Sequence, residues 1–407
     1  MFPNVIFLKW FPVIVRHAHR NWHHPLKGVG LRDSGIHFQW LKNPAGSFST
    51  GVSLHSHTLH SKESLDFIQR VTKDTPWLGG AIRKQTDRYR AINGRDIDFS
   101  KAWWTPPLAA RHAWELEKGQ IEGVLGLKGL VSLTDHDTID ACLHLHVLEG
   151  MRDVPVSVEW TIPYAPTFFH IGVHNLPAED APAMMREMEA FTDNPVEAKI
   201  GEMLEWVSRD ARTLVIINHP CWDENHIGAE EHRATVIRFL DNYRPFIHAA
   251  ELNGLRPWDE NQKAADLAAR YKLPVISGGD RHGREPNANV NLTNATTFSE
   301  FVDEVRSDAH SEVLFMSQYR DPLKMRILEN MADIIEDDPR HAMGWVKWSD
   351  RVFWENPDGE VKSVGEHWGN KVPRVVNRFV NLMSLVKHRR VRSVLRVALE
   401  ENRQFAV

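Results

Sequence analysis

The stretch GVSLHSH, residues 51–57, is a short apolar run that ends in two histidines. Six similar runs follow it along the chain: GLVSLTDHD (129–137), VPVSVE (154–159), FFHIGVH (168–174), TLVIINH (213–219), IHAAELN (247–253) and PVISGGD (274–280). Short apolar runs rich in β-branched residues predict buried strands. Each run ends in His, Asp, Asn or Glu. The sequence therefore predicts seven strands whose carboxyl ends carry polar side chains.

Stretches with helical spacing lie between most of these runs, most clearly at residues 107–125, 196–209, 228–243 and 259–272. Strands that alternate with helices predict parallel pairing, in either a barrel or an open α/β sheet. The carboxyl ends of barrel strands meet at one mouth, where active sites are built. Because ligand-type residues occur at so many strand ends, we predict an α/β fold of the TIM-like β/α barrel type.

The predicted barrel has a segment on either side of it. We divide the chain into an N-terminal extension at residues 1–48, the barrel at 49–310, and a C-terminal helical and irregular segment at 311–407. Turn and breaker residues at about 66–104 indicate an insertion. We expect this insertion and the Trp-rich stretch 338–370 to shape the rim of a pocket. Residues 373–402 predict one or two amphipathic helices, which we expect to pack on the barrel or on a second subunit.

The composition limits the classes of function. The chain has 407 residues, 42% of them hydrophobic and 25% charged, which is ordinary for a globular protein. A net charge of -5 gives no basic character that would attract nucleic acid. Two cysteines, Cys142 and Cys221, exclude a disulfide framework and fit a reducing compartment. Since neither a membrane span nor a signal peptide is recognisable, we expect a cytoplasmic protein.

The clearest chemical signal is the pair His55 and His57. Side chains two apart in a strand point to the same side, so both imidazoles can meet one ion. A single His-x-His pair is a weak signal, and the chain has another at residues 17–19. The first pair differs because similar residues close the later strands: His136, Glu159, His170, His219, Asp280 and His282. Imidazoles combined with carboxylates suit Zn, Mn or Fe.

Five motifs, HSHTLHS, LTDHDT, the single Glu159, INHP and GGDRH, occur in that order between residues 51 and 290. Together they resemble the four-motif pattern of the PHP (polymerase and histidinol phosphatase) superfamily. The resemblance implies a distorted seven-stranded β/α barrel that binds two or three metal ions, often Mn, Zn or Fe. It also implies hydrolysis of phosphate esters.

The resemblance further implies which metal each ligand would hold. His55, His57 and Asp280 would hold the first metal, Glu159 would bridge the first and second, His170 and His219 would complete the second, and His136 and His282 would belong to a third. Family members often have an acidic residue or a histidine where this chain has Lys62. Lys62 is therefore expected either to point to solvent or to contact the substrate phosphate in place of the third ion.

Two bridged metals explain hydrolysis of a phosphate ester, because they lower the pKa of a bound water and neutralise charge on the phosphoryl oxygens. The leaving group also needs a proton, for which Asp135, Asp137 and His282 are unranked candidates. Arg281 and Arg284 follow the last motif and could grip phosphate through their planar forks.

We therefore predict a metal-dependent phosphoesterase that acts on a small phosphorylated molecule or a nucleotide, with two or three divalent ions (Mn, Zn or Fe). One alternative is a nuclease that acts on DNA or RNA ends through the same metals. The lack of a recognisable nucleic-acid module weighs against it. Another alternative is a regulatory protein that binds metal without turnover, which the nearly complete ligand set disfavours. Neither nucleic acid nor a membrane is an expected partner.

Overall fold

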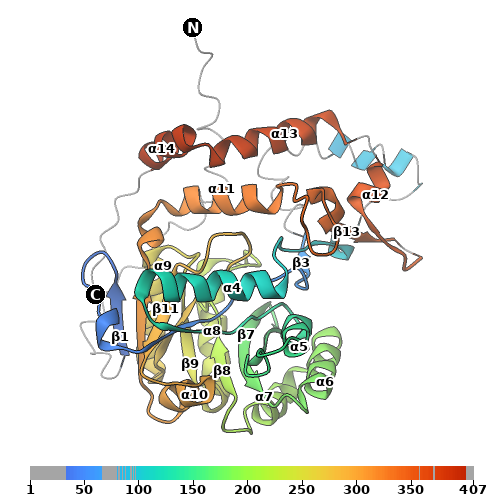
Figure 1. Ribbon diagram of the computed structural model, residues 1–407. Helices are drawn as coiled ribbons and strands as arrows, with labels where there is room; N and C mark the ends of the chain where they lie inside the picture. Colours follow the sequence, from blue (N-terminus) through green and yellow to red (C-terminus); the bar gives the residue numbers. More distant parts are fainter. Residues whose placement is uncertain are drawn as a thin grey trace.

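The computed structural model describes residues 34–399, apart from residues 67–79, 81–82, 85, 88, 92–93, 95, 97, 357 and 370–371. The His pair at residues 17–19 and most of the predicted insertion lie outside the described residues. Figure 1 shows a body of strands and surrounding helices, above which α11 and then α13 and α14 form further layers. The α/β class predicted from the sequence is confirmed.

Two five-stranded sheets form the body. The first has the order β1 (Ser34–Phe38), β12 (Ser311–Phe315), β11 (Asn289–Thr293), β2 (Thr50–Ser53) and β5 (Lys128–Val131). The second has the order β10 (Val275–Gly278), β9 (Ala249–Asn253), β8 (Leu214–Ile217), β7 (Thr167–Leu176) and β6 (Val156–Tyr164). All seven predicted strands are present. β1 and β12 lie outside the predicted barrel limits of 49–310 and pair in the same sheet as β2 and β5.

The direction of pairing differs in part from the prediction. The pairs β2–β5, β8–β9 and β9–β10 are parallel, as expected. The prediction is wrong for β7, which is antiparallel to both β6 and β8. β6 ends at Tyr164 and β7 begins at Thr167. So short a turn makes a hairpin, because a parallel crossover needs a dozen or more residues.

The strand ladders of the described residues do not join the two sheets into one closed barrel. Two isolated parallel bridges nevertheless link the sheets. One joins Ser56 and Arg281, which follow β2 and β10, and the other joins His136, which follows β5, to Glu159 within β6. Side chains from both sheets also meet in one apolar cluster, which includes Val52 of β2 and Ile276 of β10. The two sheets therefore share a core and are tied together at the end that carries the predicted ligands.

The four helices predicted between the strands are confirmed: α4 (Ala110–Gln120), α7 (Ile200–Val207), α8 (Ala229–Tyr243) and α9 (Trp258–Tyr271). Three further helices, α5 (Asp140–His146), α6 (Ala181–Asp193) and α10 (Phe298–Arg306), have no sequence prediction. α10 buries Phe298, Phe301, Val302 and Val305 in the cluster shared by both sheets. These four residues recur every three or four positions, which places their side chains on one face of the helix.

A small sheet unites two segments that are distant in the sequence. Its order is β14 (Val361–Ser363), β13 (Val352–Glu355), β4 (Ala102–Trp104) and β3 (Glu63–Ser64). β4 comes from the end of the predicted insertion, whereas β13, β14 and α12 (Val364–Trp368) come from the stretch 338–370 that was expected to be irregular. β3 directly follows the first histidine motif. The two predicted rim segments therefore come together beside that motif.

The C-terminal helices pack on α11 (Leu323–Ile334). The stretch 373–402 contains two helices, α13 (Arg374–Ser384) and α14 (Arg389–Ala398), as predicted. They lie end to end beyond α11 (Figure 1), and Met383 and Val386 join Met325 and Leu328 of α11 in a buried apolar cluster. None of the described helices combines the length and apolarity needed to cross a bilayer.

Candidate metal centre

Glu159, within β6, lies at the centre of the predicted ligands. Its Oε2 atom is 3.0 Å from His55 Nε2, 3.3 Å from His57 Nε2 and 3.3 Å from His136 Nδ1. Its Oε1 atom faces the other side, 3.2 Å from His219 Nε2 and 3.5 Å from His170 Nδ1. Glu159 is fully buried. One carboxylate therefore connects two groups of imidazoles, which is the arrangement expected of a bridging ligand.

Asp280 faces the first of these groups. Its Oδ1 atom is 3.7 Å from His55 Nε2 and 3.5 Å from His57 Nε2. The backbone of His55, His219 and Asp280 has positive φ (62°, 27° and 55°). Non-glycine residues rarely adopt that conformation, and it persists where the surrounding structure enforces it. These three ligands therefore sit at strained turns just beyond the strand ends, where the chain leaves the sheet.

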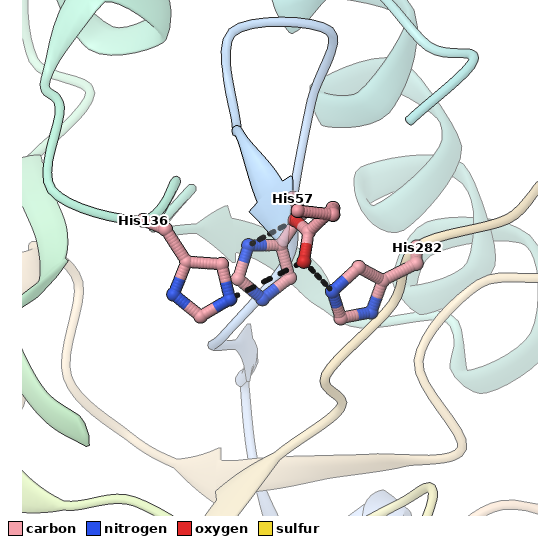
Figure 2. Close-up of side chains that lie close together, drawn as sticks. His57, His136 and His282 are labelled. Carbon is pink, nitrogen blue, oxygen red and sulfur yellow. Dashed lines mark ion pairs between the residues drawn. The ribbon is translucent and has the colours of Figure 1, made fainter. Parts of the chain in front are cut away.

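A third group of ligand atoms forms around Glu63. Glu63 Oε2 is 3.1 Å from His282 Nε2 and 3.4 Å from His136 Nε2, and Glu63 Oε1 is 3.8 Å from His57 Nδ1. Figure 2 shows the rings of His57, His136 and His282 converging. The rings of His57 and His282 are stacked with centroids 4.1 Å apart. The predicted third pair, His136 and His282, is therefore brought together with a carboxylate.

Of the two positions expected for Lys62, the structure shows the exposed one, and Glu63 supplies the acidic group. Glu63 is buried, whereas Lys62 is exposed and its Nζ lies 5.3 Å from the centre of the Trp103 ring. Neighbouring residues in extended chain point to opposite sides, so only one of the two can face the histidines. The signal was present in the sequence as an acidic residue one position after Lys62.

The donor set fits divalent transition metals. Three groups of side chains each bring their ligand atoms within 4.8 Å of one another. They are His55, His57 and Glu159; His136, Glu159 and His170; and His57, Glu63, His136 and His282. His57 Nε2 is buried and has no hydrogen-bond partner among the described residues. A buried polar atom without a partner is costly. Imidazole and carboxylate ligands in this combination favour Zn, Mn or Fe.

The charges of the cluster also suit cations. Burial opposes ionisation of Glu159, but the neighbouring His55 and His136 hold its pKa well below the usual range. Burial likewise opposes the charge on Asp280, but the nearby imidazoles of His57 and His55 hold that pKa well below its usual range. Burial lowers the pKa of His57 to about 3. Burial alone would lower the pKa of His55, His136 and His282 too, but the neighbouring carboxylates outweigh it and raise the pKa of all three rings. Metal binding requires neutral imidazoles, so a bound ion would displace protons from these three rings.

A second layer of polar groups orients the histidines. Glu251, in β9, accepts hydrogen bonds from His55 Nδ1 (2.5 Å) and from the backbone N–H of His219 (2.6 Å). Fixing Nδ1 in this way turns His55 Nε2 towards the cluster. Gly278 makes room for this carboxylate, because a Cβ atom there would lie 1.4 Å from Glu251 Oε1. Glu251 has no predicted role, although it lies in one of the predicted strands.

The predicted proton donors lie in different surroundings. Asp135 accepts hydrogen bonds from the backbone N–H (2.5 Å) and Oγ1 (2.7 Å) of Thr58, and burial raises its pKa to about 7. Asp137 accepts from the backbone N–H of Thr161 at 2.8 Å. Both carboxylates therefore hold backbone segments beside the cluster, whereas His282 lies within it.

The structure does not bring Arg281 and Arg284 into the cluster as predicted. Arg281 is buried, and its guanidinium donates to Glu117 Oε1 (2.8 Å), Gly283 O (2.8 Å) and His57 O (2.9 Å). Arg284 pairs with two acidic residues of the C-terminal segment, Glu336 (2.9 Å) and Asp338 (2.8 Å). Both forks are occupied by protein acceptors, so being next to a motif in sequence did not place either side chain at the site.

No family model and no curated protein matches the chain. Among solved structures, PsfC from Pseudomonas syringae PB-5123 is 14% identical, with a TM-score of 0.37 over 66% of this chain and 93% of that one. A candidate metal-dependent phosphoesterase from Bifidobacterium adolescentis ATCC 15703 is 16% identical, with a TM-score of 0.30 over 49% and 91% of the two chains. An amidohydrolase from Chromobacterium violaceum with bound sulfate and no metal is 16% identical, with a TM-score of 0.30 over 58% and 89%. These values assign neither a family nor an activity to this chain.

Proposed function

We propose that the chain is a metal-dependent phosphoesterase that hydrolyses a phosphate ester of a small molecule or a nucleotide. The observation that carries this proposal is Glu159, a buried carboxylate whose two oxygens face separate groups of imidazoles. When divalent ions are bound there, the chemistry that they supply is activation of water and neutralisation of phosphoryl charge.

Each predicted ligand has a proposed place in this centre. His55, His57 and Asp280 would hold one ion, Glu159 would bridge to a second that His170 and His219 complete, and Glu63, His136 and His282 would hold a third. Two of the groups of ligand atoms share Glu159, and two share His136. Because the groups share ligands, loss of a shared residue should affect more than one ion.

Aromatic side chains surround the cluster and would exclude water from it. Trp104 of β4 lies against His282 (ring centroids 5.8 Å apart), Phe168 of β7 against His170 (5.1 Å) and Trp222 against His219 (5.1 Å). Excluding water strengthens electrostatic interactions within a site. Since Trp104 comes from the predicted insertion, this rim would also contact the organic part of the substrate.

We further propose that the two five-stranded sheets act as one distorted barrel. The bridges Ser56–Arg281 and His136–Glu159 support this proposal. They connect the first sheet to both edges of the second sheet, at β10 and at β6. The apolar cluster shared by β2, β8, β9 and β10 supports it as well. Such closure would gather the ligand-bearing strand ends around a single mouth.

The test combines metal analysis with hydrolysis of nitrophenyl phosphates. Protein purified without chelator, or reconstituted with Mn, Zn or Fe, should contain two or three ions per chain and release nitrophenol. Turnover of the monoester would identify a phosphatase, and turnover of the diester a phosphodiesterase or the alternative nuclease. A metal-loaded protein that hydrolyses neither ester would overturn the proposal in favour of a regulatory metal-binding protein.

A further inference from the structure

Arg256 brings a positive charge to the edge of the metal centre. It lies in the loop after β9, and its guanidinium carbon is 3.4 Å from the centre of the Trp222 ring. The same ring contacts His219, with centroids 5.1 Å apart. On its other side, Arg256 Nη2 lies 3.7 Å from Asp280 Oδ2. The guanidinium is therefore held beside ligands proposed for two different ions.

The side-chain nitrogens of Arg256 make no hydrogen bonds to the residues that the structure describes. Its Nε atom is buried and has no hydrogen-bond partner among the described residues. The carboxylates of Asp280 and Glu260 are 3.7 and 4.0 Å from its nitrogens, which is beyond hydrogen-bond distance. A guanidinium carries five N–H donors in one plane. Stacking on Trp222 fixes that plane and leaves its edge available to a ligand.

The other arginines near the last motif show the contrast. Arg281 donates to three protein acceptors within 2.9 Å, and Arg284 pairs with Glu336 and Asp338. The terminal nitrogens of both groups donate to protein acceptors and so connect parts of the fold, although Arg284 Nε is buried without a hydrogen-bond partner among the described residues. Of the three arginines, Arg256 is the one whose terminal nitrogens make no hydrogen bond to the described residues, and its side chain is 18% exposed.

We propose that Arg256 binds the phosphoryl group of the substrate and thereby selects phosphate esters, an inference that rests on the proposed function. A planar guanidinium matches two oxygens of a phosphoryl group through paired, charge-assisted hydrogen bonds. Because Arg256 lies beside Asp280, the group that it contacts is the one that the metal centre would act on. Trp222 is the positioning residue that holds the fork in place.

Binding of inorganic phosphate to the metal-loaded full chain tests this inference without turnover. Isothermal titration calorimetry should show Arg256→Gln weakening phosphate binding by about tenfold or more, since charge-assisted hydrogen bonds are lost. Arg256→Lys should retain part of the affinity, because it keeps the charge but loses the fork. Arg284→Gln is the matched control and should bind phosphate like the wild type. Metal content should be the same in all four proteins.

Two results would overturn the inference: phosphate affinity in Arg256→Gln equal to that of the wild type, or acetate binding as tightly as phosphate. Trp222→Phe should preserve affinity, whereas Trp222→Ala should lower it if stacking positions the fork. The two proposals fail in distinguishable ways. Arg256-dependent phosphate binding in a protein that hydrolyses no ester rejects the phosphoesterase and retains the anion site. Ester hydrolysis with an unchanged KM in Arg256→Gln rejects the anion site and retains the phosphoesterase.

Discussion

Glu63 Oε2 lies 3.1 Å from His282 Nε2, although the two residues are far apart in the sequence. Glu63 lies in β3, and His282 follows β10. This contact makes Glu63 the acidic member of the third group of ligand atoms. We therefore expect Glu63→Gln to lose about one metal ion per chain, because a neutral amide is a weaker ligand for Zn, Mn or Fe than a carboxylate. Elemental analysis measures the loss, and the neighbouring Lys62→Ala is the control, which should keep its metal content. Unchanged metal content in Glu63→Gln would remove Glu63 from the site.

Glu159→Gln should have a larger effect, because its carboxylate faces two groups of histidines at once. We expect loss of more than one ion per chain and of nearly all ester hydrolysis, while the circular dichroism spectrum stays that of the wild type. Glu115→Gln, an exposed glutamate on α4 paired with Arg111, provides a control for the substitution itself. A Glu159→Gln protein that keeps both its metals and its turnover would show that the bridge has been placed wrongly.

Arg281 should affect stability and not substrate binding. Removing one partner of its buried pair with Glu117 leaves an uncompensated charge, which costs about 3–5 kcal/mol in comparable sites. Urea unfolding of Arg281→Gln should show a loss of this order. The exposed pair Arg111–Glu115 should be worth only about 0.5 kcal/mol, so Arg111→Gln is the matched comparison. If Arg281 instead grips phosphate, its substitution will raise KM and leave the unfolding curve nearly unchanged.

His248 makes part of the stability dependent on pH. Its Nδ1 accepts a hydrogen bond from the backbone N–H of Val215 (2.9 Å), which requires a neutral ring. Burial, with Arg306 and Arg244 nearby, lowers its pKa from 6.5 to about 3. Because the pKa is lower in the folded state, this stabilisation is present above pH 6.5 and is lost as the pH falls towards 3. The loss is at most about 1.4 kcal/mol per pH unit.

Urea unfolding between about pH 7.5 and 5.5 measures this dependence. His248→Gln should lose stability less steeply with falling pH than the wild type, whereas substitution of the exposed His112 by Gln should not change the slope. Equal slopes for wild type and His248→Gln would mean that the pKa of His248 is the same in the folded and unfolded protein.

The C-terminal helices should not bind anionic vesicles. Several basic side chains in α14 and in the turn before it are already paired with acidic residues at or near α11: Lys387 with Asp333 (2.5 Å), Arg392 with Glu329 (2.7 Å) and Arg396 with Asp321 (2.6 Å). Charges that are neutralised in this way attract a lipid surface less strongly. Co-sedimentation with phosphatidylserine vesicles is the measurement. Binding that salt weakens and truncation at Pro373 abolishes would contradict this expectation.

The parts of the fold that were predictable from sequence are those with local signals. The seven runs that became strands are short, β-branched and bounded by polar residues, so the pattern identified them. The antiparallel course of β7 was missed, since the alternation of strands and helices was applied to a place where a hairpin turn intervenes. β11 and β12 were missed as well, although they complete the first sheet.

The candidate site was predictable as a set of ligands but not as a set of contacts. The eight predicted metal ligands lie together around Glu159 and Glu63. Glu63 itself was missed because β3 is only two residues long and has no period to detect; it is placed by pairing with β4. Arg281 and Arg284 were predicted to bind substrate because they adjoin a motif, and Arg256 was not considered. The direction in which each of these side chains points depends on tertiary packing and not on distance along the sequence.

The small sheet has a consequence for the order in which this protein is assembled on the ribosome. β3 pairs with β4, and the other edge of β4 pairs with β13, which spans Val352–Glu355. During synthesis, the histidine motifs leave the exit tunnel long before β13 is made. The nascent chain can therefore gather most of its imidazoles early, while the strand that carries Glu63 gains its full support only after β13 has been made. Premature termination before β13 would release a chain that contains every ligand but lacks the means to position one of them.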